Sequence, residues 1–177
     1  MQASLERGSI MTSQMTGWKE LLQVLNALNK SYQSLIELSK KKHKALVFID
    51  LKSLEAMNET EAKLTQDIRQ LEERRQKVLI HLAVENRDIK KDTRMAELVR
   101  YAPTPQIHAL LAQLHKTLTA STTKAQELRD NNRVLIEGAL SAVTYHLNRL
   151  GGTHVENAYG STGQEVVTHA RNFEFKA

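Results

Sequence analysis

Residues 105–150 read PQIHALLAQLHKTLTASTTKAQELRDNNRVLIEGALSAVTYHLNRL, and this stretch decides the fold. Small or apolar residues recur in it in alternating steps of four and three, the heptad pattern of a helix packed against other helices. These positions are Ile107, Leu111, Leu114, Leu118, Ser121, Ala125, Leu128, Asn132, Leu135, Ala139 and Ala142. A helix of this length measures about 70 Å at about 1.5 Å per residue, and its single stripe needs partner helices to cover it.

Two earlier segments show the same helical spacing. The first carries Trp18, Leu21, Leu22, Leu25, Leu28, Tyr32, Leu35 and Ile36, and we expect its helix to run from a cap at Ser13 or Thr16 to about Val47. The second carries Met57, Glu61, Leu64, Ile68, Leu71, Arg75, Val78 and Leu82, with Asp50 as its expected N-cap. A short helix is expected around Met95, Leu98 and Val99, and Thr104 before Pro105 is a start signal for the last helix.

Glycine and proline mark the boundaries of this helical body. Between Trp18 and Leu150 the chain has one glycine, Gly138, and two prolines. We therefore predict an all-α fold: an elongated antiparallel bundle of three long helices, a short extra helix and a flexible C-terminal tail. The expected division is a flexible N-terminus over 1–15, the bundle over 16–150 and a partner-binding tail over 151–177. Three of the eight aromatic residues fall in that tail, which is unusual for a merely solvated segment.

Composition argues against an enzyme. The chain has no cysteine, which excludes disulfides, thiolate metal sites and a cysteine nucleophile. Its seven histidines show no pair at the spacing of a helical zinc site, and Gly151-Gly152 and Gly160 to Gly163 fit neither a phosphate loop nor a nucleophile elbow. We assign no catalytic residue, metal or cofactor. No apolar run reaches about 18 residues and no signal peptide is recognisable, so we expect a cytoplasmic protein without stable membrane insertion.

The net charge of +5 comes mostly from one cluster, Lys40, Lys41, Lys42 and Lys44. The favoured interpretation is a solvated helix end, because no aromatic residue is interleaved for base stacking. We therefore expect no nucleic-acid partner. The alternative is a phosphate, nucleic-acid or membrane-surface contact, and steep salt dependence would be its signature.

Several motifs resemble the FlgN family of flagellar type III export chaperones. They are Leu128-Arg129-Asp130, the run Asn132 to Gly138, Tyr159-Gly160-Ser161-Thr162-Gly163-Gln164, and upstream Glu61-Ala62-Lys63 and Leu71 to Arg75. The resemblance covers about residues 60 to 169. The Tyr-Gly-x-x-Gly-Gln motif is its most specific part, and the chain departs from the family pattern at Arg133, where glycine is frequent.

The resemblance implies a cytosolic chaperone that binds hook-filament junction proteins, prevents their premature association and delivers them to the export apparatus. It places client binding in the C-terminal part, here at Asn132, Leu135, Ile136, Gly138, Val166, Val167, Phe173 and Phe175. It implies contact with the cytoplasmic domain of the export gate at Tyr159, Gly160 and Gly163.

A second hypothesis comes from a different class of protein. The heptad stripes also suit a structural coiled-coil protein that acts by homo-oligomerisation, and a homodimer stays open under both hypotheses. That alternative leaves the aromatic tail and its Tyr-Gly motif without a purpose. Deletion of residues 151–177 separates the two, because the oligomeric state should change only for the structural protein.

Overall fold

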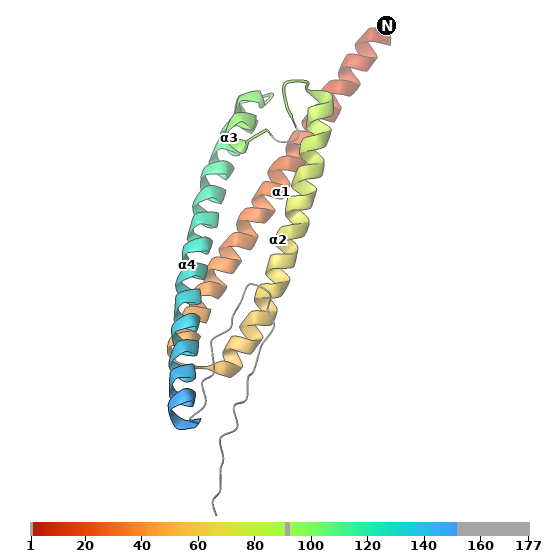
Figure 1. Ribbon diagram of the computed structural model, residues 1–177. Helices are drawn as coiled ribbons and strands as arrows, with labels where there is room; N and C mark the ends of the chain where they lie inside the picture. Colours follow the sequence, from red (N-terminus) through yellow and green to blue (C-terminus); the bar gives the residue numbers. More distant parts are fainter. Residues whose placement is uncertain (1, 91–92, 152–177) are drawn as a thin grey trace, which may run out of the picture. The chain divides into compact units, whose positions relative to one another are not determined.

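The computed structural model describes residues 2–90 and 93–151, with side chains from residue 15 to residue 150. This part of the chain is helical and contains no strand, which confirms the predicted all-α fold of three long helices and a short one (Figure 1). The elements are α1 Gln2–Val47, α2 Leu51–Glu85, α3 Met95–Leu98, the 3-10 turn η1 Val99–Tyr101, and α4 Pro105–Gly151. The predicted C-terminal tail lies outside the described residues.

The chain divides into two compact units. The first ends at Asp130 and the second begins at Asn131, within α4. The expected three-part division at residues 15 and 150 stays a prediction.

The start of α1 differs from the sequence-based expectation. The helix begins at Gln2, so the cap predicted at Ser13 or Thr16 is wrong. The helix also passes through Gly17, a residue that usually weakens a helix by about 1 kcal/mol relative to alanine. Gly17 is buried in a tight contact with Leu82 of α2, and this packing outweighs its low helix propensity.

The core of the first unit lies where its three long helices meet. Helices α1 and α2 run antiparallel, and α4 runs in the direction of α1 (Figure 1). The buried residues of this core are Trp18, Leu21, Val24, Leu25, Leu28, Val78, Leu79, Leu82, Ile89, Leu98, Ile107 and Leu111. Ile89 and Leu98 belong to the α2–α4 connection, so this connection closes one end of the core.

Polar groups join α1 to α4 beyond this core. The buried Ser121 hydroxyl accepts a hydrogen bond from Gln33 Nε2 at 2.8 Å and donates one to Asn29 Oδ1 at 2.9 Å. Buried polar groups of this kind need their partners, because an unpaired one costs the full desolvation energy. The pairing therefore favours one register of α4 against α1.

The two polar positions in the α2 stripe also have partners. Glu61 forms an ion pair with Lys42 of α1, and Arg75 Nε lies 2.7 Å from Glu72 Oε2 of its own helix. One lysine of the basic cluster is therefore bound to the bundle. Lys40 forms a second, exposed pair with Glu37 at 2.7 Å.

Two predicted helix caps are confirmed. The Asp50 carboxylate accepts a hydrogen bond from Ser53 N at 3.1 Å at the start of α2. Thr104 Oγ1 accepts one from Ile107 N at 3.2 Å at the start of α4. Each satisfies an amide that the first helical turn leaves without a partner.

Candidate functional site

The apolar stripe of α4 changes character near Asn132. Ile107, Leu111, Ser121 and Ala125 are buried, as a bundle core requires. Asn132 is the last buried residue of α4 in the described part of the chain. Beyond it the helix continues for five turns with its large apolar side chains facing solvent.

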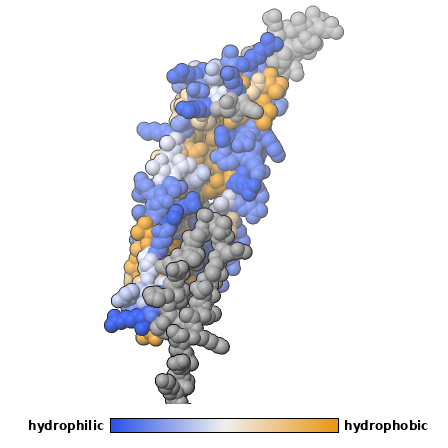
Figure 2. Space-filling model, in the orientation of Figure 1, coloured by the Kyte–Doolittle hydropathy of each residue, from blue (hydrophilic) through white to orange (hydrophobic). Residues whose placement is uncertain are grey.

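A second set of apolar residues at heptad spacing begins in this last part of α4. It is offset by one residue from the stripe that starts at Ile107. Its members, which we name the exposed seam, are Ile136, Leu140, Val143, Leu147 and Leu150, with exposed fractions of 37, 43, 56, 56 and 85%. Their steps of four and three place them on one face of the helix, over about 21 Å. Figure 2 shows hydrophobic side chains gathered over this half of α4, along the lower left edge of the view. A continuous exposed apolar strip of this kind usually marks an interaction site.

The opposite face of this segment is different. Val134 and Tyr145 are exposed there, and the two positions between them at heptad spacing are Gly138 and Ser141. A Cβ atom built on Gly138 would meet nothing within 4 Å. The Tyr145 ring contacts His146 in a T-shaped arrangement with centroids 5.5 Å apart. This face therefore offers isolated apolar side chains rather than a strip.

Charged residues border the exposed seam on one side. Arg133 Nε lies 2.7 Å from Glu137 Oε1, one helical turn further along α4. An exposed pair of this spacing stabilises a helix by about 0.3–0.5 kcal/mol. The pair holds the residue at which the chain departs from the FlgN pattern, Arg133, against the helix surface.

The predicted client-binding residues separate into three groups. Leu135 and Ile136 are exposed, and Ile136 begins the exposed seam. Gly138 lies on the opposite face, and Asn132 is only 5% exposed. Val166, Val167, Phe173, Phe175 and the predicted gate-binding Tyr159, Gly160 and Gly163 lie outside the described residues. Their roles stay predictions.

Sequence reasoning missed four of the five exposed seam residues: Leu140, Val143, Leu147 and Leu150. The signal was present, because these residues continue the four-three spacing from Ile136. Leu135, Ala139 and Ala142 also continue the heptad spacing of the upstream residues. Because that stripe was followed to the end of the helix, the second spacing from Ile136 was overlooked.

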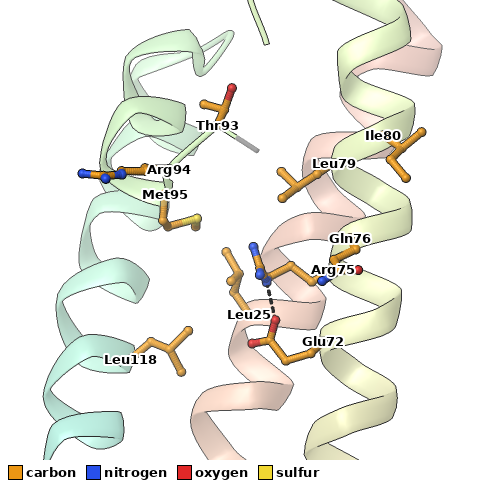
Figure 3. Close-up of a pocket in the computed structure, with 10 residues that line it drawn as sticks. All are labelled: Leu25, Glu72, Arg75, Gln76, Leu79, Ile80, Thr93, Arg94, Met95 and Leu118. Atoms are coloured by element: carbon orange, nitrogen blue, oxygen red, sulfur yellow. Dashed lines mark hydrogen bonds and ion pairs between the residues drawn. The ribbon is translucent and has the colours of Figure 1, made fainter. Parts of the chain in front are cut away.

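A second apolar surface lies in the first unit. A groove of about 680 Å³ opens between α2 and the start of α3, and Leu25, Leu79, Met95 and Leu118 turn towards it (Figure 3). The ion pair of Glu72 and Arg75 lies at its side (Figure 3). Leu25 and Leu79 belong to the buried core, so these two side chains offer little exposed surface in the groove.

Tyr32 of α1 is a titratable group whose pKa is perturbed. Burial, and then the Glu72 carboxylate, raise the pKa of Tyr32. The described residues contain no cluster of three or more histidines and carboxylates suited to a metal ion. None of the described helices is long and apolar enough to cross a membrane.

Fold and surface together define a class: a helical bundle protein whose last helix exposes an apolar face. The FlgN family model matches residues 11–166, which is most of the chain. The chain therefore belongs to the FlgN family, the chaperones of flagellar type III export. No curated protein and no solved structure matches it.

Proposed function

We propose that this protein is a cytoplasmic chaperone that binds hook-filament junction proteins through the exposed seam of α4. The exposed seam carries the proposal, because five large apolar residues at heptad spacing face solvent. Family membership supports a flagellar export substrate as the client. The terminal helices of such a client would otherwise pair with each other, and a seam of matching spacing offers them a temporary partner.

The energetics suit a chaperone that must release its client. Burial of one leucine or valine side chain contributes about 1.5–3 kcal/mol, so five partly exposed residues provide enough for binding even after the cost of association. The exposed seam contains no ionised residue and needs no desolvation of charge. Binding is thus tight enough to exclude self-association of the client yet reversible at the export apparatus.

The test is titration calorimetry of the full-length chain against each purified hook-filament junction protein. The double variant Leu140→Ser, Leu147→Ser should lower the affinity at least about tenfold, because it removes two central apolar contacts. Leu110→Ser is the matched control, since Leu110 is a half-exposed leucine elsewhere on α4. Equal affinity of the double variant and the control would refute the proposal.

We also propose that Tyr159 contacts the cytoplasmic domain of the export gate, as the Tyr-Gly motif of the family implies. Tyr159→Ala should leave folding and client binding intact and reduce delivery. The measurement is motility of the substituted strain at normal chaperone abundance, with binding to the purified gate domain as the direct assay. Unchanged motility and unchanged gate binding would exclude this role.

The exposed seam itself favours one alternative function, a homo-oligomeric structural protein. Two copies of an apolar heptad face are able to pair with each other. Sedimentation of the chain with and without residues 151–177 separates the functions. A stable oligomer that binds no junction protein, and whose state changes on truncation, would favour the structural alternative.

A further inference from the structure

The turn between α1 and α2 carries an apolar cluster that the chaperone function leaves unexplained. Val47, Phe48, Ile49 and Leu51 are 57, 80, 75 and 71% exposed, and we name these four residues the tip. They lie at the end of the helical pair, where the chain reverses direction (Figure 1). Four large apolar side chains on a projecting turn are unusual for a soluble surface.

The backbone of the tip adopts a helix-ending motif that usually contains glycine. Ile49 N donates to Leu46 O at 3.3 Å, and Asp50 N donates to Ala45 O at 2.9 Å, the paired bonds of a Schellman motif. Ile49 occupies its left-handed position with φ of 55°, and it is the one non-glycine residue with positive φ in the described part of the chain. A β-branched residue is strongly disfavoured in this conformation.

Asparagine or glycine at position 49 would form the same turn at lower energy. The isoleucine gains little burial in return, because the residue is 75% exposed. A strained apolar residue that faces solvent indicates that the side chain is needed by something outside the fold. The paired hydrogen bonds fix the chain reversal that places Phe48 and Ile49 between the end of α1 and the start of α2.

Lysines surround the tip. Lys41 and Lys44 lie on the last turns of α1, and Lys52 lies on the first turn of α2, all exposed. We name these three residues the basic collar. Lys44 and Lys52 form no ion pair with any described residue, whereas Lys40 and Lys42 are paired with glutamates. The acidic residue of the turn, Asp50, accepts hydrogen bonds from Ser53 and keeps its negative charge, so the three lysines outnumber it.

We propose that the tip and its basic collar form a reversible docking site for an anionic lipid bilayer. A convex apolar tip fits a deformable phase, whereas a protein partner would need a matching pocket. Lys44 lies about one helical turn, or about 5.4 Å, behind Phe48. With the tip at the depth of about 5–10 Å that interfacial anchors reach, the basic collar lies among the anionic headgroups.

This inference is independent of client binding, because it uses residues of the first unit alone. It adds a place of action: the chaperone collects at the membrane surface in which an export apparatus is embedded. Neither the tip nor the basic collar is sufficient for bilayer binding by itself. Each lysine near an anionic surface is worth about a fivefold gain in affinity, and the apolar residues add the anchor.

The first experiment is flotation of the full-length chain with vesicles of equal parts phosphatidylglycerol and phosphatidylcholine. We expect binding at about 0.1 M salt, little binding at about 1 M salt, and little binding to pure phosphatidylcholine. Lys44→Gln with Lys52→Gln should weaken binding more than tenfold. The control Lys77→Gln with Lys116→Gln changes the net charge equally at exposed sites away from the tip.

The second experiment uses the strain at Ile49. Ile49→Gly should raise the midpoint of unfolding and lower vesicle affinity at least fivefold, and a purely structural role of Ile49 cannot produce both changes. Because the chain has no cysteine, an environment-sensitive dye on Ile49→Cys reports the tip directly. Its emission should shift to the blue with anionic vesicles, while the same dye on Val84→Cys, an exposed site on α2, should not respond.

Three outcomes would overturn the proposal. The first is failure of the intact chain to float with anionic vesicles at low salt. The second is full binding by the tip and collar variants together with loss in Leu140→Ser, Leu147→Ser, which would assign the lipid contact to the exposed seam. The third is an unchanged emission wavelength of the dye at position 49 when the protein is bound to vesicles. That result would mean that the tip does not enter the bilayer and would favour a protein partner for it.

Discussion

The Cδ2 atom of Leu82 lies 2.9 Å from the position that a Cβ atom would take on Gly17. Leu82 is 1% exposed and belongs to the core, so it has no free space to move into. Helices α1 and α2 therefore approach closely at this level only because residue 17 has no side chain. The contact lies one residue from Trp18, the largest side chain of the core.

Gly17→Ala should consequently destabilise the protein. Overpacking of a core costs about 1–3 kcal/mol, and the better helix propensity of alanine returns about 1 kcal/mol, so we expect a net loss of about 1 kcal/mol. Gly138→Ala is the matched control in α4, where the new methyl group meets nothing. It should be neutral or stabilise by up to about 1 kcal/mol. Urea denaturation followed by circular dichroism measures both, and equal stabilisation by the two would disprove the close approach.

The hydrogen bonds of Ser121 lead to a second prediction. Ser121→Ala removes the partner of Asn29 Oδ1 and of Gln33 Nε2 and should cost about 1 kcal/mol in the free energy of unfolding. Ser141→Ala makes the same change on the same helix, where the hydroxyl bonds to Glu137 O of its own helix. That variant should be neutral within about 0.5 kcal/mol. A loss of equal size in both would mean that the α1–α4 pairing contributes nothing.

The two faces of the last part of α4 should differ in binding. Val143 lies in the exposed seam and Val134 lies on the opposite face, with similar exposures of 56 and 66%. Val143→Ser should lower the affinity for a hook-filament junction protein about fivefold to tenfold, because about 1 kcal/mol or more of apolar contact is lost. Val134→Ser should change it less than about twofold. Titration calorimetry measures the affinity of each variant for the junction protein. A larger loss of affinity in Val134→Ser than in Val143→Ser would place the client on the opposite face of α4.

The helices and most of the core could be predicted from the sequence because their signals are local. The heptad steps of α1, α2 and α4 and the caps Asp50 and Thr104 each depend on residues within a turn or two of one another. The start of α1 could not be predicted. Gly17 reads as a helix breaker until Leu82, 65 residues further along the chain, is known to occupy the space beside it.

The candidate site was predicted only in part, for a related reason. The last part of α4 carries two apolar frames one residue apart, one through Leu135 and one through Ile136. The structure leaves both frames exposed beyond Asn132, and the frame through Ile136 carries the larger apolar side chains. The conformation of Ile49 was equally inaccessible, because positive φ is normally inferred from a glycine.

The cap of α2 leads to a pH dependence. Hydrogen bonds from the Ser53 hydroxyl and the Ser53 backbone amide lower the pKa of Asp50 below its usual range. The folded state therefore favours the carboxylate more than the unfolded chain does, where the pKa is about 3.9. The stabilisation is present above about pH 4 and is lost as the pH falls through the lower pKa of the folded state.

Asp50→Asn keeps a side-chain oxygen as the cap but removes the titration. The wild-type chain should unfold at a higher temperature than the variant near pH 6, and this difference should shrink as the pH falls through the lowered pKa of Asp50. Glu37, whose pKa is lowered by its hydrogen bond to Lys40, titrates in both chains and cancels from the difference. Asp67→Asn makes the same substitution at an exposed position on α2 that caps no helix, and it is the control. A constant difference between wild type and Asp50→Asn would mean that the cap acts without its charge.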